Sequence, residues 1–205
     1  TNGSGGGNVG TDDADTDTDL AWDITTGDSS IIIAILDTGV NEHSELEGRF
    51  IPGYDYVYQD DNPNDVFGHG TSCAGIAAAK GNNNAGIAGV CWDCSIMPQK
   101  VLGDDGYGDD AVIAAAIQET AAAGAHIISM SLGGGAYNSS LDNAINYAVE
   151  QGTTVFAASG NDNNSSLSYP AGYSDCIAVG AMSPCNERKN FSSCDGENYW
   201  GSNYG

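Results

Sequence analysis

Two residue types that cooperate in proton transfer stand in short glycine-containing motifs of this sequence. Asp37 lies in D-T-G directly after an apolar run, and His69 lies in G-H-G-T. A carboxylate beside an imidazole orients the ring and stabilises its charged form, so that the other ring nitrogen can act as a base. Either residue alone also has a structural explanation, because an aspartate can cap a turn and a buried histidine can simply be hydrogen-bonded. The pair is therefore a candidate catalytic couple that needs further support.

Short apolar segments alternate with stretches of helical pattern. The first apolar run, I-I-I-A-I-L, is typical of a strand buried on both faces. Asp109 and Gly124 suit the N-cap and C′ positions of one helix, and Ser139/Ser140 with Gly152 suit those of another. This alternation predicts an α/β fold, a doubly wound and mostly parallel sheet with helices on both faces. The expected strands are 31–36, 96–102, 126–130, 153–158 and 176–181, and the expected helices are 70–80, 110–123 and 140–151.

Polar residues and glycines follow several of the expected strands. D-T-G follows the first strand, S-L-G-G-G (131–135) the third and S-G-N-D (159–162) the fourth. The carboxyl ends of parallel strands meet at one edge of an open sheet, and ligands bind there. We therefore expect Asp37, His69 and these glycine-rich loops to form one site.

Four motifs occur in order along the chain. They are D-T-G-V at 37–40, G-H-G-T-S-C-A-G-I at 68–76, S-L-G-G at 131–134 and A-S-G-N at 158–161. Their order and spacing closely resemble those of the subtilisin-like serine proteases, in particular the thermitase-like branch. The resemblance extends from about Ala21 to the end of the chain. It implies a three-layer subtilisin-like fold and a serine endopeptidase that acts on proteins or peptides.

The resemblance implies a role for each residue of the candidate site. Asp37 would orient His69, which would act first as general base and then as general acid. Asn161 would donate its side-chain amide to the oxyanion of the tetrahedral intermediate. The implied substrate-binding residues are Ser131, Leu132 and Gly133 on one wall of the primary pocket, Ala158, Ser159 and Gly160 on the opposite wall, and Gly106, Tyr107 and Gly108, which would pair with the substrate backbone.

The nucleophile motif of this family is missing from the sequence. In the family the serine lies in G-T-S-M-A, well beyond the oxyanion asparagine, whereas only 44 residues follow Asn161 here and none of them spell that motif. Gly201-Ser202-Asn203 is no substitute, because no apolar helix follows it. We therefore expect an incomplete domain, with residues 1–19 as a flexible Gly-rich and acidic segment and residues 20–205 as its N-terminal two-thirds. The serine would lie on a C-terminal piece that stays bound, as after an autolytic nick.

The composition narrows the possible partners and the compartment. The chain has 205 residues, 40% of them apolar, and a formal net charge of −23. Phosphate contacts need clustered basic residues, so nucleic acids and anionic membranes are not expected partners. No apolar run approaches the roughly 18 residues of a membrane-spanning helix. Six cysteines, an even number, favour disulfides in an oxidising compartment, and hence a secreted, extracellular protein.

Two pairs of cysteines lie close together in the sequence. Cys91 and Cys94 form C-W-D-C, which allows a zinc site, a redox motif or a structural disulfide. Zinc needs two further ligands and no second close Cys/His pair is present, while a redox motif would open a helix rather than lead into a strand. A structural bridge is favoured, as it is for Cys185 and Cys194 around a polar turn. The other two cysteines cannot be paired from the sequence.

Two loops rich in acids and amides are candidate calcium sites. Hard cations prefer carboxylate and amide oxygens carried on a flexible loop. For the first loop, residues 55–65, an acidic surface turn is the alternative. For the second loop, G-N-N-N-A-G-I-A-G, the resemblance implies a calcium ion wrapped by side-chain and main-chain oxygens. The ligands implied by the resemblance are Asp55, Asp60, Asn62 and Asn64 in the first loop, and Glu45, Gly81, Asn83, Ala85 and Ile87 around the second.

Two rival interpretations belong to other functional classes. A non-catalytic product, either a fragment or a pseudoprotease that binds peptides without cutting them, would not need the nucleophile. A calcium-binding adhesion module would explain the acidic loops but not G-H-G-T. The presence of Asp37, His69 and Asn161 together favours the protease, because a decayed enzyme has no reason to keep all three.

Overall fold

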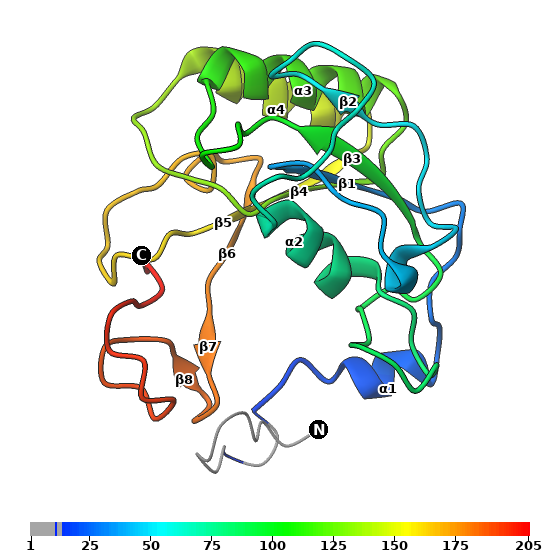
Figure 1. Cartoon of the computed structure of the whole chain (residues 1–205). Coiled ribbons are helices and arrows are strands. Elements are labelled where there is room, and N and C mark those ends of the chain that lie inside the picture. Colours follow the sequence, from blue (N-terminus) through cyan, green and yellow to red (C-terminus); the bar gives the residue numbers. More distant parts are fainter. Residues whose placement is uncertain (1–10, 12–13) are drawn as a thin grey trace.

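The computed structural model describes residue 11 and residues 14–205, and it contains a parallel sheet with helices on both faces (Figure 1). All five predicted strands and all three predicted helices are present, so the α/β fold class is confirmed. In chain order the elements are α1 (Thr18–Trp22), β1 (Ile32–Asp37), the 3-10 turn η1 (Ser44–Leu46), β2 (Tyr54–Asp55), α2 (His69–Ala78), β3 (Ser95–Lys100), α3 (Asp110–Ala122), β4 (Ile127–Met130), α4 (Ser139–Glu150), β5 (Thr154–Ala158), β6 (Ile177–Val179), β7 (Met182–Ser183) and β8 (Glu187–Arg188).

The main sheet has the strand order β2-β3-β1-β4-β5-β6, and every neighbouring pair is parallel. β1 lies inside the sheet, where it pairs with β3 along its whole length and with β4 on its other side. Leu36 packs into the core on one face and Ile35 into the core on the other. The continuous apolar run suits this position, because an inner strand of a parallel sheet is buried on both faces. β1 therefore delivers its last residue, Asp37, to the middle of the carboxyl edge.

α3 and α4 cover one face of the sheet, the upper one in Figure 1. α3 begins at its predicted N-cap, Asp109, whose side chain accepts a hydrogen bond from the Ala111 N–H (2.8 Å). For α4 the predicted cap is wrong by one residue, since the N-cap is Asn138 and not Ser139/Ser140. The Asn138 side chain accepts from the Ser140 N–H, and asparagine caps a helix as well as serine does. Each helix is followed by a glycine in the left-handed region, as predicted.

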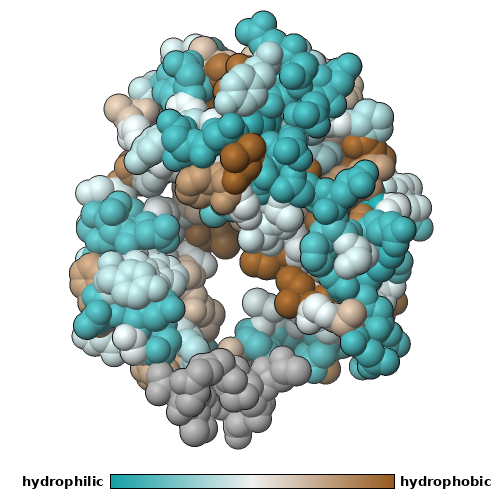
Figure 2. Space-filling model, in the orientation of Figure 1, coloured by the Kyte–Doolittle hydropathy of each residue, from teal (hydrophilic) through white to brown (hydrophobic). Residues whose placement is uncertain are grey.

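The opposite face of the sheet is only partly covered. α2 packs there against β1 and β3. Next to it, Phe156 of β5 is half-buried, and Ile177 and Val179 of β6 are 48% and 50% exposed. On α2, Ile76 is 63% exposed. Figure 2 shows apolar surface around a deep opening near the centre of the molecule. In the described part of the chain, one face of the sheet is thus closed and the other half open.

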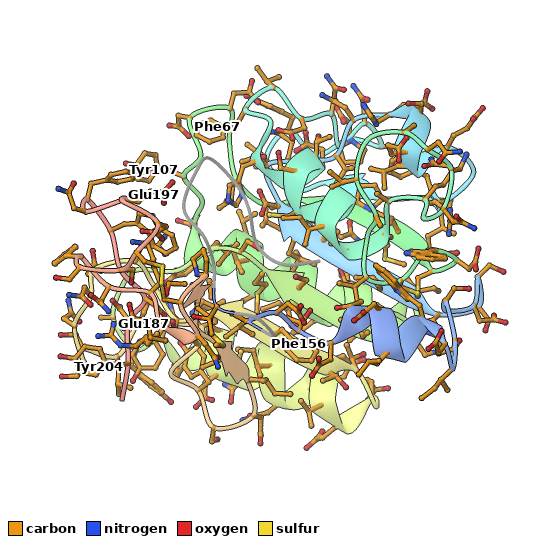
Figure 3. All side chains as sticks on the ribbon, turned by 90° about the horizontal axis from the view of Figure 1, so that it is seen from below. Phe67, Tyr107, Phe156, Glu187, Glu197 and Tyr204 are labelled. Atoms are coloured by element: carbon orange, nitrogen blue, oxygen red, sulfur yellow. A yellow bond between two sulfur atoms is a disulfide. The ribbon has the colours of Figure 1, made fainter. Side chains whose placement is uncertain are left out.

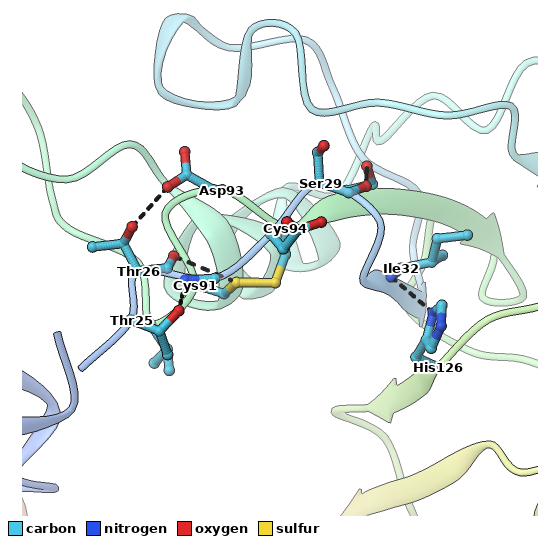
Figure 4. Close-up of a disulfide and its surroundings, with 12 residues drawn as sticks. Thr25, Thr26, Ser29, Ile32, Cys91, Asp93, Cys94 and His126 are labelled. Carbon is cyan, nitrogen blue, oxygen red and sulfur yellow. Dashed lines mark hydrogen bonds between the residues drawn. A yellow bond between two sulfur atoms is a disulfide. The ribbon is translucent and has the colours of Figure 1, made fainter.

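Both predicted cysteine pairs form disulfides, Cys91–Cys94 and Cys185–Cys194. The first bridge closes the turn before β3, where Asp93 accepts a hydrogen bond from the Thr26 hydroxyl (Figure 4). Because its two sulfurs are bonded to each other, C-W-D-C is a structural bridge here and not a zinc site. The remaining cysteines are free thiols, Cys73 in α2 and Cys176 before β6.

Several short elements are not predicted from the sequence. β2, β7 and β8 have two residues each and α1 has five, which is too short to leave a periodic pattern. α1 spans the domain boundary expected at residue 20, and most of the flexible segment expected at 1–19 lies outside the described residues. In the described part of the chain, no helix has the length and apolar character needed to cross a membrane.

Candidate active site

Asp37 and His69 meet at the carboxyl edge of the sheet. Asp37 ends β1 and His69 begins α2. The distance between Asp37 Oδ1 and His69 Nδ1 is 2.7 Å. Gly70 allows this close packing, because a Cβ atom there would lie 2.1 Å from the Gly39 carbonyl oxygen. The structure therefore brings these two predicted residues into direct contact.

The two side chains differ in exposure. The Asp37 side chain is 1% exposed, whereas that of His69 is 44% exposed. Asp37 Oδ1 also accepts a hydrogen bond from the Thr38 N–H (2.7 Å), which fixes the carboxylate. Because Asp37 binds Nδ1, the Nε2 atom of His69 is free to take a proton from a reacting group. This is the geometry of a general base oriented by a buried carboxylate.

A second buried carboxylate, Asp65, joins the two loops that carry this couple. Its oxygens accept hydrogen bonds from the Thr38 hydroxyl (2.8 Å), the Gly68 N–H (2.7 Å), and the N–H and hydroxyl of Thr71 (2.9 and 2.6 Å). Burial by itself raises the pKa of Asp65, but these hydrogen bonds outweigh it and hold the pKa below its usual value. Asp65 is not among the predicted site residues. Its position four residues before His69 is the sequence feature that would have pointed to the site.

Asn161 lies three residues after β5, at the same edge of the sheet as Asp37. β5 is separated from β1 by β4 alone. The main-chain carbonyl of Asn161 accepts a hydrogen bond from the Gly201 N–H (3.2 Å). Its side chain makes no hydrogen bond within the described residues and is exposed. The carboxamide is therefore available to a ligand, as an oxyanion donor must be.

The two segments predicted as walls of the primary pocket lie side by side at the ends of the neighbouring strands β4 and β5. Residues 131–133 follow β4 directly, and residues 158–160 form the end of β5 and the turn after it. A Cβ atom on Gly133 would lie 3.7 Å from the Ala158 carbonyl oxygen and 2.9 Å from Ser168 Oγ. Ser168 therefore lies against the first wall, close to the second, and is a site residue that the sequence does not predict.

The third predicted substrate segment, residues 106–108, lies in the loop between β3 and α3. The Gly103 N–H donates to the Tyr107 carbonyl (2.7 Å), which closes the loop. Tyr107 is 79% exposed and lies beside Phe67 at the rim of the molecule in Figure 3. A Cβ atom on Gly106 would lie 3.2 Å from the Phe67 ring. The loop thus stands next to the turn that leads into His69, with the Tyr107 side chain exposed.

The first predicted calcium loop is closed mainly by its own hydrogen bonds. The backbones of Asp55 and Asp60 bond to each other in both directions (2.8 and 3.2 Å). Asp55 Oδ1 accepts from two N–H groups of the same turn, and Asp60 Oδ1 accepts from the Asn62 N–H (2.9 Å). The Asn64 N–H donates to the Asn62 carbonyl (2.7 Å). The four predicted ligand residues thus share one turn, but some of their oxygens already have protein donors.

The second predicted loop curls around a buried carboxylate. Glu45 is 7% exposed and accepts hydrogen bonds from Asn83 Nδ2 (3.3 and 3.2 Å). No basic side chain of the described residues pairs with it, since the nearby Lys80 pairs with another glutamate. A buried carboxylate without a cationic partner, in a loop rich in oxygens, fits a hard cation. Of the predicted main-chain ligands, Ala85 and Ile87 line an open hollow in this loop, whereas Gly81, the first residue of the loop, does not line it.

No serine hydroxyl contacts the His69 ring within the described residues. Besides Asp37, its polar neighbour is the thiol of Cys73, 3.9 Å from Nδ1. Burial raises the pKa of this thiol, which disfavours the thiolate that a cysteine nucleophile needs. Ser202 is 1% exposed, and its hydroxyl accepts a hydrogen bond from the Ala181 N–H (3.0 Å). The described chain thus supplies a base and its orienting acid, but no activated nucleophile.

Replacing Asp65 by Asn is expected to destabilise the fold in a pH-dependent way. Because the pKa of Asp65 is lowered in the folded chain, its stabilising contribution is complete above the unfolded value of about 3.9 and is lost as the pH falls through the lower folded value. The loss of unfolding free energy in Asp65→Asn should therefore be largest near neutral pH and should shrink below about pH 4. Urea denaturation over a pH series measures it.

Asp61→Asn is the matched control, because Asp61 is exposed on the same loop. It should change the unfolding free energy little at any pH. An Asp65→Asn defect of the same size at pH 7 and at pH 3 would contradict the assignment of a lowered pKa to Asp65.

The chain matches the subtilase family over residues 28–203. It is 45% identical to thermitase of Thermoactinomyces vulgaris over an alignment of 174 residues. This alignment covers 84% of this chain and 62% of that relative. It is 44% identical to the thermophilic serine proteinase of Bacillus sp. (strain AK1) over an alignment of 177 residues. This alignment covers 86% of this chain and 44% of that relative. Among solved structures, sphericase superposes with a TM-score of 0.72 at 40% sequence identity, over 77% of this chain and 55% of the other.

The chain therefore spans about half the length of the relatives that it matches. The family match includes Asp37, His69 and Asn161, and it runs through nearly all of the described residues. A match of this extent, on a fold that brings the acid and the base into contact, means that the chain belongs to the subtilase family.

Proposed function

We propose that this chain is the N-terminal part of the catalytic domain of a secreted serine endopeptidase. The observation that carries the proposal is the 2.7 Å contact between Asp37 Oδ1 and His69 Nδ1, in a ring that is otherwise half exposed. Such a couple needs a hydroxyl nucleophile to complete a catalytic triad. The serine would come from a C-terminal segment outside this chain, held in place after an autolytic nick. Two disulfides support the secreted location.

In this proposal His69 moves a proton in both halves of the reaction. Its Nε2 atom takes the serine hydroxyl proton as the oxygen attacks the peptide carbonyl, and then gives a proton to the leaving amine. Asp37 stabilises the imidazolium between these steps. The free carboxamide of Asn161 would donate to the oxyanion of the tetrahedral intermediate. Water then hydrolyses the acyl-enzyme by the same route.

The half-open face of the sheet supports binding of a further segment. Parallel sheets are normally covered on both faces, and β6 is an edge strand of the sheet in the described part of the chain. A segment packed between α2 and β6 would bury the exposed Ile177 and Val179. It would also place a residue close to the start of α2, where His69 lies. The apolar area buried there would hold the segment after cleavage of the chain.

The proposed substrates are proteins and peptides. The loop at 106–108 would take the substrate backbone as an added strand, and the primary pocket would receive one side chain. The walls at 131–133 and 158–160 carry no charged residue. An aromatic or large aliphatic side chain at the primary position fits these walls best.

We also propose calcium as a bound cofactor with a stabilising role. The buried Glu45, with Asn83 and the carbonyl groups of the 81–87 loop, would hold one calcium ion. The ion would in turn offset the uncompensated negative charge of Glu45. A further candidate calcium site is the turn with Asp55, Asp60, Asn62 and Asn64. It rests on the carboxylate and amide oxygens of these residues, which are of the type that calcium binds. Bound calcium would supply no step of peptide hydrolysis.

A peptide-binding pseudoprotease is the second candidate function. It is favoured by one observation, the lack of a serine hydroxyl at His69 in the described part of the chain. It leaves the Asp37–His69 contact without a use. An adhesion module that binds calcium would account for the acidic loops alone.

Labelling of the purified protein with an active-site-directed fluorophosphonate tests the proposed function. A denaturing gel and intact-mass analysis should show a second, smaller polypeptide that carries the label. His69→Ala should abolish labelling, because the serine is then no longer activated. His126→Ala is the matched control, because His126 lies at the opposite edge of the sheet, just before β4, and should keep the label. A second polypeptide without label favours the pseudoprotease, and a single unlabelled polypeptide overturns the proposal.

Calcium is expected to raise the midpoint of thermal unfolding, and EDTA to lower it. A ligand that binds only the folded state stabilises it by about 2.7 kcal/mol at 100 times its Kd. Glu45→Gln should remove most of the calcium-dependent shift, because it removes the buried charge. Differential scanning calorimetry of the wild type and of Glu45→Gln, each in calcium chloride and in EDTA, measures these midpoints.

The control for this experiment is Glu47→Gln, because the Glu47 side chain is 80% exposed. It should keep the calcium-dependent shift of the wild type. Identical midpoints of the wild type in calcium and in EDTA would show that the calcium proposal is wrong.

A further inference from the structure

The loop that carries Asn161 is held by a segment distant in sequence, residues 201–204. The Asn203 N–H donates to the Gly160 carbonyl (2.9 Å), and the Gly201 N–H donates to the Asn161 carbonyl (3.2 Å). On the other side of Asn161, the Gly201 carbonyl accepts from the Asn163 N–H (2.9 Å). The backbone on both sides of the candidate oxyanion donor is therefore bonded to the same segment.

The side chain of Asn203 adds contacts that the backbone cannot supply. Its Oδ1 atom accepts hydrogen bonds from the Asp162 N–H (2.9 Å) and the Asn164 N–H (3.4 Å). Asn203 is 7% exposed, so water is poorly placed to replace it. Gly160 has a φ of +104°, and a Cβ atom there would lie 2.5 Å from Asn203 Nδ2. The carboxamide thus fills the space beside Gly160 and bonds the peptide group that follows Asn161.

Arg188 fastens the same segment from the outside. Its Nη1 atom donates to Asn163 Oδ1 (2.8 Å) and to the Ser202 carbonyl, and its guanidinium lies 4.4 Å from the centre of the Tyr204 ring. Tyr204 and Glu187, the neighbour of Arg188, lie on the same side of the molecule in Figure 3. Arg188 and the 201–204 segment therefore form one support under the Asn161 loop.

We propose that Asn203 is a positioning residue that acts through Asn161. An oxyanion donor is effective only if it is held in place before the charge develops. Asn161 follows Gly160, whose backbone has no Cβ atom to restrict it, and the loop around Asn161 contains several small polar residues. Without the Asn203 acceptor, the Asp162 and Asn164 N–H groups lose their partner and the loop can move. This inference rests on the proposed peptidase function and adds a residue to its site.

The kinetic test uses the active protein, the chain with its nucleophile-bearing segment. Asn203→Leu keeps the side-chain size but removes the acceptor, whereas Asn203→Asp keeps an acceptor oxygen. Displacing a group of the site by a fraction of an ångström to 1 Å costs about 10- to 100-fold in rate. We expect Asn203→Leu to lower kcat by about that factor with little change in KM, and Asn203→Asp to restore most of the rate. Asn143→Leu, on the exposed side of α4, is the matched control and should be unaffected.

A double-mutant cycle shows whether the effect passes through Asn161. Removal of such a donor lowers kcat by about 10²- to 10³-fold in subtilisin, and we adopt that figure for Asn161→Leu. In the Asn161→Leu background, Asn203→Leu should cause little further loss, because the donor that it positions is already gone. An equal loss in both backgrounds, or no loss in the wild-type background, would overturn the proposal.

Amide hydrogen exchange separates this inference from the proposed function, because it needs no activity. The N–H groups of Asp162 and Asn164 should exchange slowly in the wild type and in Asn203→Asp, and faster in Asn203→Leu. Exchange at Ile117, buried in α3, should be the same in all three and shows that the fold is intact. If the wild type cleaves no peptide, the proposed function fails, and exchange alone decides whether Asn203 holds the loop. Unchanged exchange in Asn203→Leu overturns it.

Discussion

The contact between the buried Asp37 and the half-exposed His69 is the interaction that the rest of this structure positions. A carboxylate removed from water is costly unless it is hydrogen-bonded. Asp37 obtains its partners from Thr38 and His69, and Asp65 ties together the loops that carry both. The inner strand of a parallel sheet supplies the rigid base from which Asp37 projects. The proposed chemistry thus depends on a carboxylate held in the protein interior and an imidazole that is half exposed.

The sheet that carries Asp37 is covered by helices on one face and only partly on the other. α3 and α4 close one face of the sheet, while β5 and β6 remain partly open on the other face beside α2. The chain spans about half the length of the relatives that it matches. Within the described residues, this open face lacks cover and the His69 ring lacks a serine hydroxyl. The segment proposed above would meet both requirements at once, because it would cover apolar surface and supply a hydroxyl. The support under the Asn161 loop lies wholly within this chain.

The features that were predictable from the sequence leave local patterns. The apolar run of β1, the cap at Asp109 and the close pair Cys91–Cys94 are each recognisable within a few residues. The contacts of Asp65 and Asn203 are not, because their partners lie up to 27 and 44 positions away and include backbone N–H groups that every residue type except proline has. The cap of α4 was missed because three successive residues, N-S-S, are equally good candidates.

Peptide hydrolysis by an Asp37→Asn variant of the active protein tests most directly whether Asp37 orients His69 for proton transfer. Asparagine preserves the size of the side chain but favours the wrong ring tautomer of the histidine, which in an Asp-His-Ser triad costs about 10⁴-fold in kcat. We predict a loss of that order, with KM for a peptide with an aromatic residue at the cleavage site nearly unchanged. A variant that cleaves the peptide at the wild-type rate would contradict the role of this contact in catalysis.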